Sequence, residues 1–156
     1  MSKINLSVLI ITTALLSSCG FHTPIKNTPL NASIVSEKSN AFASELKTRF
    51  NQSANQNLTI QVGPEVQKQQ TSSYTSGNVV NSYTLNLSVP VKVYNADQKL
   101  LLAQDLKASK YLTSMKFSDG SINTQADRLQ IEESYTQLRN TLIKKLIRRL
   151  SKLNAN

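Results

Sequence analysis

Few side chains in this chain have the chemistry of a catalyst or a metal ligand. Its 156 residues include one cysteine, Cys19, and one histidine, His22. Nucleophilic catalysis needs a nucleophile with a base in reach, and zinc sites need several nitrogen or sulfur ligands. Glu132 and Glu133 are adjacent, so on a helix they point in different directions, and the four glycines form no phosphate-binding loop. The sequence therefore predicts a protein that is not an enzyme and has no cofactor or metal.

The position of Cys19 points to another chemistry. The chain starts with one charge, Lys3, then an apolar run over residues 6–16, then Ser17 and Ser18. A basic start, a short apolar run and small residues are typical of an export signal. The run is shorter than the roughly 20 residues that a membrane-spanning helix needs. An ordinary secretory signal with an incidental cysteine is the alternative.

The sequence Leu16-Ser17-Ser18-Cys19 resembles the lipobox of bacterial lipoproteins. That resemblance implies an S-diacylglycerol group on the Cys19 thiol, cleavage before Cys19, and an N-palmitoyl group on the new amino terminus. It also implies the outer membrane, because Gly20 stands where an aspartate would favour retention in the inner membrane.

Cleavage before Cys19 makes residues 1–18 a signal peptide, and removing 18 residues from 156 leaves 138. Residues 19–30 contain two prolines and no periodicity, which indicates a lipidated tether, and 31–156 are expected to form a single domain. Without Lys3, 17 basic residues face 9 acidic ones, a net charge of about +8. A basic surface favours anionic partners, and the export signal excludes nucleic acid. With its single cysteine acylated, the domain has no disulfide.

The first half of the domain reads as strand, helix, strand. Residues 32–35 are predicted as a short strand. Ser39 is the expected N-cap of a helix over about 40–52, whose apolar stripe is Phe42, Leu46 and Phe50. Residues 58–62 alternate as a second strand, and Gly63-Pro64 is expected to bend or interrupt it.

A long alternating segment follows. Residues 83–93 place an apolar side chain at every second position, which predicts a strand with one buried face. Pro90 hints at an edge or a bulge. Residues 95–98 form a turn and 99–113 return as a partner strand, with an irregularity after its run of leucines. Two interpretations stay open for the polar segment 67–78: a solvent-exposed strand extension or a mobile loop.

The chain ends in an amphipathic helix predicted over 124–153, capped by Asn123 or Thr124, with Asp127 favourable in its first turns. Its apolar residues recur every three or four positions, as one stripe requires. The predicted fold is α+β, with two helices packed on one face of a four-stranded mixed β-sheet. The stripe is Ile131, Tyr135, Leu138, Leu142, Leu146, Leu150 and Leu153.

Basic residues gather near the end of this helix with no acid between them. Lys144, Arg148 and Lys152 are spaced at i, i+4 and i+8, so they form a row whose like charges repel. An anionic partner such as a lipid A phosphate or an anionic headgroup would offset this repulsion. Complementation of the helix dipole together with solubility is the simpler alternative. The cluster comprises Arg139, Lys144, Lys145, Arg148, Arg149 and Lys152, and a second group comprises Lys107, Lys110 and Lys116.

Taken in order, these features resemble the LptE-type lipopolysaccharide-assembly lipoproteins. The resemblance rests on Cys19-Gly20-Phe21-His22 at the mature start, the small first helix, the strand over 83–93, and Leu142-Ile143-Lys144-Lys145-Leu146 in the last helix. One departure is Thr23-Pro24, where the family usually has Leu-Arg.

The resemblance implies a lipid-anchored protein on the periplasmic face of the outer membrane. It implies a 1:1 complex in which the protein plugs the LptD β-barrel and binds lipopolysaccharide on its way to the outer leaflet. It also implies lipopolysaccharide contacts for basic residues near a sheet edge, which here are Lys107, Lys110 and Lys116. Lys144, Arg148 and Lys152 are further candidate lipopolysaccharide or anion contacts. The alternatives are an accessory subunit of another envelope lipid transporter or scaffold, and a lipid-anchored enzyme.

Overall fold

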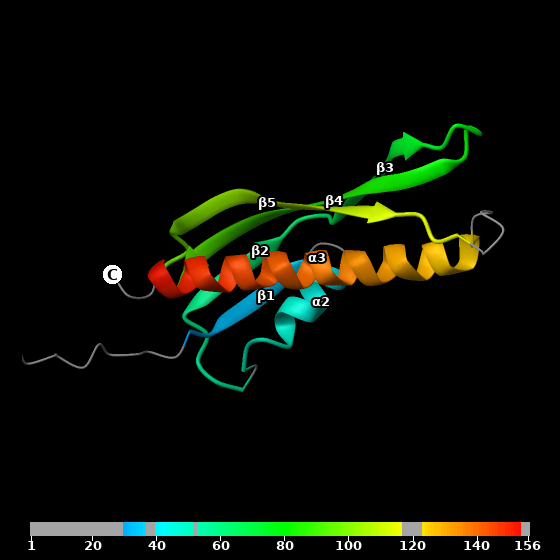
Figure 1. The fold of residues 1–156 in the computed structure, drawn as a ribbon. Coiled ribbons are helices and arrows are strands. Elements are labelled where there is room, and N and C mark those ends of the chain that lie inside the picture. Colours follow the sequence, from blue (N-terminus) through cyan, green and yellow to red (C-terminus); the bar gives the residue numbers. More distant parts are fainter. Residues whose placement is uncertain (1–29, 37–39, 52, 117–122, 154–156) are drawn as a thin grey trace, which may run out of the picture.

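The computed structural model describes residues 30–36, 40–51, 53–116 and 123–153. Cys19, the signal peptide and most of the tether lie outside the described residues. The elements follow one another as five strands and two helices (Figure 1). They are β1 (Ala32–Ser36), α2 (Ala41–Lys47), β2 (Leu58–Val62), β3 (Val66–Tyr74), β4 (Val80–Asn95), β5 (Leu100–Thr113) and α3 (Thr124–Leu153).

The sheet is organised around the 16-residue strand β4. β5 pairs antiparallel with nearly its whole length, while β2 and β3 pair antiparallel with successive parts of its other side. β1 extends the sheet as a parallel neighbour of β2. The α+β class and the mixed sheet are therefore confirmed.

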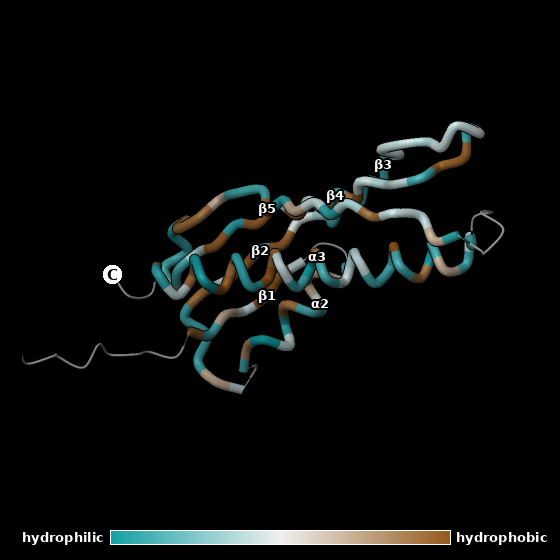
Figure 2. Tube along the Cα trace, in the orientation of Figure 1, coloured by the Kyte–Doolittle hydropathy of each residue, from teal (hydrophilic) through white to brown (hydrophobic). Residues whose placement is uncertain are grey.

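The sheet has five strands, so the predicted number of four was wrong. The missing strand is β3. It occupies most of the segment 67–78, for which two interpretations, an exposed strand extension and a mobile loop, were left open. Almost every β3 residue is exposed, so the strand lacks the apolar alternation that identifies a half-buried strand. Hydroxyl pairs hold it to β4, with 2.6 Å between Ser72 and Thr84 and 2.6 Å between Ser73 and Ser82. Figure 2 shows its polar character beside the more apolar β4.

Of the two positions that Pro90 suggested, an edge or a bulge, the edge is wrong, because Pro90 lies in a central strand. The Gly63 N–H donates to the Pro90 carbonyl at 2.9 Å, so the polar groups of Pro90 face the gap where β2 ends and β3 has not begun. The N–H and C=O of one strand residue point to the same side, so the donor that proline lacks would face this gap. The break at Gly63–Glu65 thus lets β4 carry a proline at its centre.

Both helices cover one face of the sheet, with α3 packed against β4 and β5 and α2 against β1 (Figure 1). The core beneath them combines the inward positions of β4 with the predicted stripe of α3 and the small helix. Ile131 is only partly buried and Leu153 is 39% exposed, so the stripe is buried chiefly between them. The largest fully buried side chains of the core include Phe42, Leu46, Ile60, Leu85, Leu87, Leu106, Leu142, Ile143, Leu146 and Leu150.

Several predicted boundaries shift by a few residues. The N-cap of α2 is Asn40, whose Oδ1 accepts from the Ala43 N–H at 2.7 Å, rather than Ser39, which lies outside the described residues. The helix ends at Lys47, earlier than predicted, although Phe50 still packs into the core. The irregularity in β5 is a register shift at Leu101, between the pairs Val93–Leu102 and Tyr94–Leu100.

Within the described residues, no helix has both the length and the apolarity that crossing a bilayer requires.

The close approach at Gly63 gives a first prediction. A Cβ there would lie 2.6 Å from Pro90 Cγ, so we expect Gly63→Ala to lower the free energy of unfolding by about 1–3 kcal/mol, measured by urea denaturation. Gly77→Ala is the matched control, because the nearest atom to its added Cβ would be Thr75 Oγ1 at 3.9 Å. Equal stability of the two variants would contradict the proposed crowding.

Candidate anion-binding surfaces

The helix-free face of the sheet carries a small hollow. Strand pairing places Ser88 opposite Lys107, and Asn86 opposite Ser109, on that face. These four side chains, with Leu87 and Ala108, line a hollow of about 200 Å³. An ammonium, two hydroxyls and an amide are groups that donate hydrogen bonds to a phosphate or a sugar.

A second lysine stands on the other side of this hollow. Lys68 of β3 pairs directly with Asn86, so Lys68 and Lys107 flank β4 on the same face. Two strand spacings and an offset of two residues along β4 separate their backbones by about 12 Å. Both side chains are exposed. Lys68 was missed by the sequence prediction, because its place beside the hollow depends on recognising β3 as a strand and on knowing its register.

The other two lysines of the β5 group lie elsewhere. Lys110 lies on the helix-covered face, where its Nζ donates to Gln137 Oε1 of α3 at 2.6 Å. Lys116 Nζ donates to Asn81 Oδ1 at 2.9 Å near the start of β4. Residues that are an odd number of positions apart along a strand face opposite sides of the sheet, as Lys107 and Lys110 do. The structure therefore separates Lys107 from Lys110 and Lys116.

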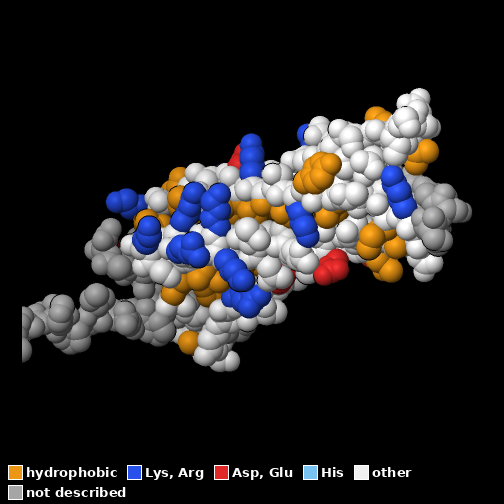
Figure 3. Space-filling view, in the orientation of Figure 1, with side chains coloured by type: hydrophobic (Ala, Val, Ile, Leu, Met, Phe, Trp, Pro, Cys, Tyr) orange, Lys and Arg blue, Asp and Glu red, His pale blue; other side chains and the backbone are white. Residues whose placement is uncertain are grey.

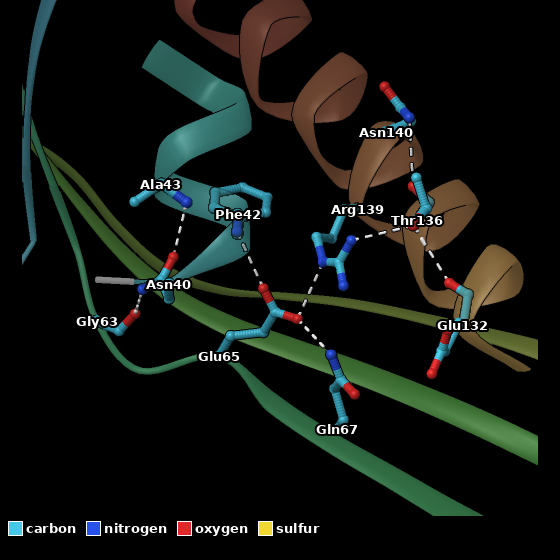
Figure 4. Close-up of polar contacts among 10 residues, drawn as sticks. All are labelled: Asn40, Phe42, Ala43, Gly63, Glu65, Gln67, Glu132, Thr136, Arg139 and Asn140. Carbon is cyan, nitrogen blue, oxygen red and sulfur yellow. Dashed lines mark hydrogen bonds and ion pairs between the residues drawn. The ribbon is translucent and has the colours of Figure 1, made fainter. Parts of the chain in front are cut away.

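One member of the α3 cluster is an internal residue (Figure 4). The Arg139 Nε donates to Glu65 Oε1 at 3.1 Å, and their side chains are only 15% and 7% exposed. The other carboxylate oxygen of Glu65 accepts from the backbone N–H of Phe42 in the first turn of α2 at 3.0 Å. Glu65 thus joins the break in the sheet to both helices, and Arg139 is a structural residue.

The remaining cations of the cluster are exposed. Figure 3 shows Lys and Arg side chains gathered over the C-terminal half of α3. Within the described residues, none of the five has a hydrogen bond or an ion pair with another side chain. We call them the α3 cation row: Lys144, Lys145, Arg148, Arg149 and Lys152.

The opposite end of α3 is fixed by a buried carboxylate. Asp127, 4% exposed, accepts from the Tyr83 hydroxyl at 3.1 Å and from the Met115 backbone N–H. Asn123 is the N-cap, because its Oδ1 accepts from the Ala126 N–H at 3.0 Å. Asp127 therefore holds α3 to β4 and to the end of β5, in addition to its predicted place near the helix dipole.

The six candidate residues do not form one site. Met115 binds Asp127, so Lys116 belongs to the N-terminal end of α3, whereas Lys152 lies 25 residues further along the helix. At 1.5 Å per residue this is about 38 Å. A single phosphate group cannot contact both ends, so Lys116 and Lys152 belong to separate surfaces.

Other features of the described residues carry little chemistry. They contain no group of three His, Cys, Asp or Glu side chains that could hold a metal. A hollow of about 540 Å³ borders the break in the sheet, and its lining includes both Lys92 and Asp105. The mixed charge makes it a poor anion site. Burial raises the pKa of the Tyr135 phenol.

Comparison with known proteins decides the family. The model of the LptE lipopolysaccharide-assembly family matches residues 28–150, which is most of the chain. The chain belongs to the LptE family. The predicted resemblance is confirmed, and the family is one of non-enzymatic lipopolysaccharide-assembly lipoproteins. No curated protein sequence matches the chain.

Solved lipoproteins share the fold. Rare lipoprotein B from Shewanella oneidensis is 12% identical with a TM-score of 0.65, covering 81% of this chain and 97% of its own. Lipoprotein B from Nitrosomonas europaea is 15% identical with a TM-score of 0.62, covering 81% and 84%. A lipoprotein from Caulobacter crescentus is 10% identical with a TM-score of 0.54, covering 80% and 91%. At these identities the likeness shows the fold alone.

The buried ion pair gives a second prediction. We expect Arg139→Met to lower the free energy of unfolding by about 3 kcal/mol, because it leaves the Glu65 carboxylate buried without its cation. Arg148→Met makes the same change on the exposed side of α3 and should alter stability by less than about 0.5 kcal/mol. Chemical denaturation of both variants tests the difference, and similar losses would show that Arg139 is no more than a surface charge.

Proposed function

We propose that this LptE-family chain is an outer-membrane lipoprotein that assembles with the LptD β-barrel in a 1:1 complex, plugs its lumen and binds lipopolysaccharide in transit to the outer leaflet. The match to the family over residues 28–150 carries this proposal. In it, residues 1–18 are a signal peptide, 19–30 are a tether lipidated at Cys19, and 31–156 are a single domain on the periplasmic face of the membrane.

The helix-free side of the sheet supports a role as a plug. The side chains there on β4 include Thr84, Asn86 and Ser88, all partly exposed, and β3 adds a polar surface on both of its faces. Lumens of outer-membrane barrels are polar and are filled in some barrels by a plug. A solvated face with hydrogen-bonding side chains is compatible with a polar lumen wall, whereas an apolar face would not be.

We propose the hollow between Lys68 and Lys107 as the lipopolysaccharide contact. Lipid A presents phosphate groups on a sugar backbone. The hollow offers the Lys107 cation with hydroxyl and amide donors, and Lys68 adds a second cation on the same face of the sheet, on the other side of β4. Lys110 and Lys116, already hydrogen-bonded to Gln137 and Asn81, are secondary contacts in this proposal.

A lipid-anchored accessory subunit of another envelope transporter or scaffold is the second candidate function. It would use the same export signal and the same anchor, but it would associate with a periplasmic or inner-membrane partner.

Purification from native membranes separates the two functions. Under our proposal, the chain fractionates with the outer membrane and co-purifies in equimolar amount with a large β-barrel identified by mass spectrometry. The same spectra should show Cys19 as the first residue, carrying diacylglycerol and an N-linked acyl chain. Inner-membrane retention, or release of the chain alone on solubilisation, would favour the second function.

Charge reversal tests the glycolipid contact. We expect Lys68→Glu with Lys107→Glu to reduce binding of purified lipopolysaccharide by at least about tenfold, because each reversal replaces an attraction by a repulsion worth about 1 kcal/mol or more. Thermal unfolding should change little, since both side chains are exposed. Arg128→Glu, an exposed charge reversal in the first turns of α3, is the control and should leave binding unchanged. Equal binding by all variants would remove the hollow from the proposal.

A further inference from the structure

One end of the molecule gathers the start of the domain and the end of α3. Strand pairing aligns Ala32 with Leu58 and Leu58 with Asn95, so the start of β1 and the turn after β4 lie together. α3 is fixed by Asp127 at the other end, beside Tyr83, and runs back along β4. Figure 1 shows its last turns toward the same end of the molecule as the start of β1. We call this the anchor end, because Leu30, the last residue of the predicted tether and the first described residue, packs against the core there.

The anchor end is strongly cationic. The α3 cation row lies on the last three turns of the helix, and Lys99 in the turn before β5 adds an exposed cation. In the sequence, Glu133 is the last acid before the C-terminus. Asp97, in the same turn as Lys99, is an acid on this end, and its carboxylate accepts from Asn95 Nδ2 at 3.3 Å.

Helix-dipole complementation does not account for this row. The effect of the dipole on a charge is confined to the last turn of a helix. Lys152 lies in that turn, whereas Lys144 and Lys145 lie more than two turns before Leu153. Repulsion along the row therefore remains uncompensated within the described residues, and an anionic surface outside the chain would offset it.

We propose that the α3 cation row rests on the anionic phospholipid headgroups of the leaflet that holds the Cys19 lipid. The inference rests on the lipid anchor of the proposed function. Eleven residue steps separate Cys19 from Leu30, a reach of at most about 40 Å. The tether thus joins the domain at the end where the row is exposed, and it keeps that end near the membrane.

The shape of the row favours a bilayer surface over a single ligand. Lys144 and Lys152 are eight residues apart, so the row extends about 12 Å along the convex outer side of a helix. Such a spread of charge meets several headgroups at once. A lipid chain and a basic patch together give the two signals that stable membrane attachment needs, and the second one also sets the orientation of the domain.

The experiment measures how closely each end of α3 approaches the headgroups. The mature lipidated protein is reconstituted in vesicles of phosphatidylcholine alone or with phosphatidylglycerol. A fluorophore on Ser151→Cys reports the anchor end, and one on Gln125→Cys reports the opposite end. Both positions are exposed. A quencher attached to headgroups gives the signal, and acylated Cys19 leaves each variant with one free thiol.

We expect phosphatidylglycerol to raise quenching at position 151 at least about twofold, and high salt to abolish the rise because it screens exposed charges. Position 125 should not respond. Reversing Lys144, Arg148 and Lys152 to Glu should remove the rise, while the control Arg128→Glu should retain it. All variants should float with the vesicles through their lipid.

Quenching at 151 that is independent of lipid charge would overturn the proposal, as would an unchanged signal in the triple variant. A rise with lipopolysaccharide in phosphatidylcholine vesicles, and none with phosphatidylglycerol, would assign the row to the glycolipid instead. Failure of the mature chain to float would reject the anchor itself, which is a separate outcome from a floating chain whose quenching ignores lipid charge.

Discussion

The carboxylate of Glu65 is the contact on which the arrangement of the elements depends. It lies at the break between β2 and β3, receives the backbone N–H of Phe42 from α2, and pairs with Arg139 of α3. One side chain thus fixes both helices to the same point of the sheet. A buried ion pair is favourable only when its geometry and its additional hydrogen bonds are good, and Gln67 supplies a further donor to this carboxylate at 2.6 Å.

The break that positions Glu65 also sets the shape of the sheet. Because the gap at Gly63–Glu65 lies beside Pro90, the strand paired with this side of β4 changes there from β2 to β3. β3 has little apolar surface of its own, as Figure 2 shows. The domain consequently combines a packed face of the sheet, covered by α2 and α3, with a solvated face that offers polar side chains to a partner.

Patterns with one buried face were predictable from the sequence, and contacts between distant residues were not. The alternation from Tyr83 to Val93 gave β4, and the leucine stripe gave α3, because burial on one side imposes a period. Both faces of β3 are exposed, so its sequence shows no alternation of apolar and polar residues. Arg139 was grouped with the basic cluster of α3 because its ion-pair partner, Glu65, lies 74 residues away in sequence. Lys68 was overlooked for the same reason as its strand.

The outer side of β5 carries the backbone groups through which sheets aggregate edge to edge. Among the described strands β5 pairs only with β4, and Asp105 lies opposite Pro90, whose polar groups point the other way. Asp105 and every second residue beside it therefore turn their backbone donors and acceptors outward, as a template on which a foreign strand could align. Charged Asp105 and Lys107 among those positions keep this border hydrated. These charges disfavour pairing with a foreign strand and so oppose aggregation.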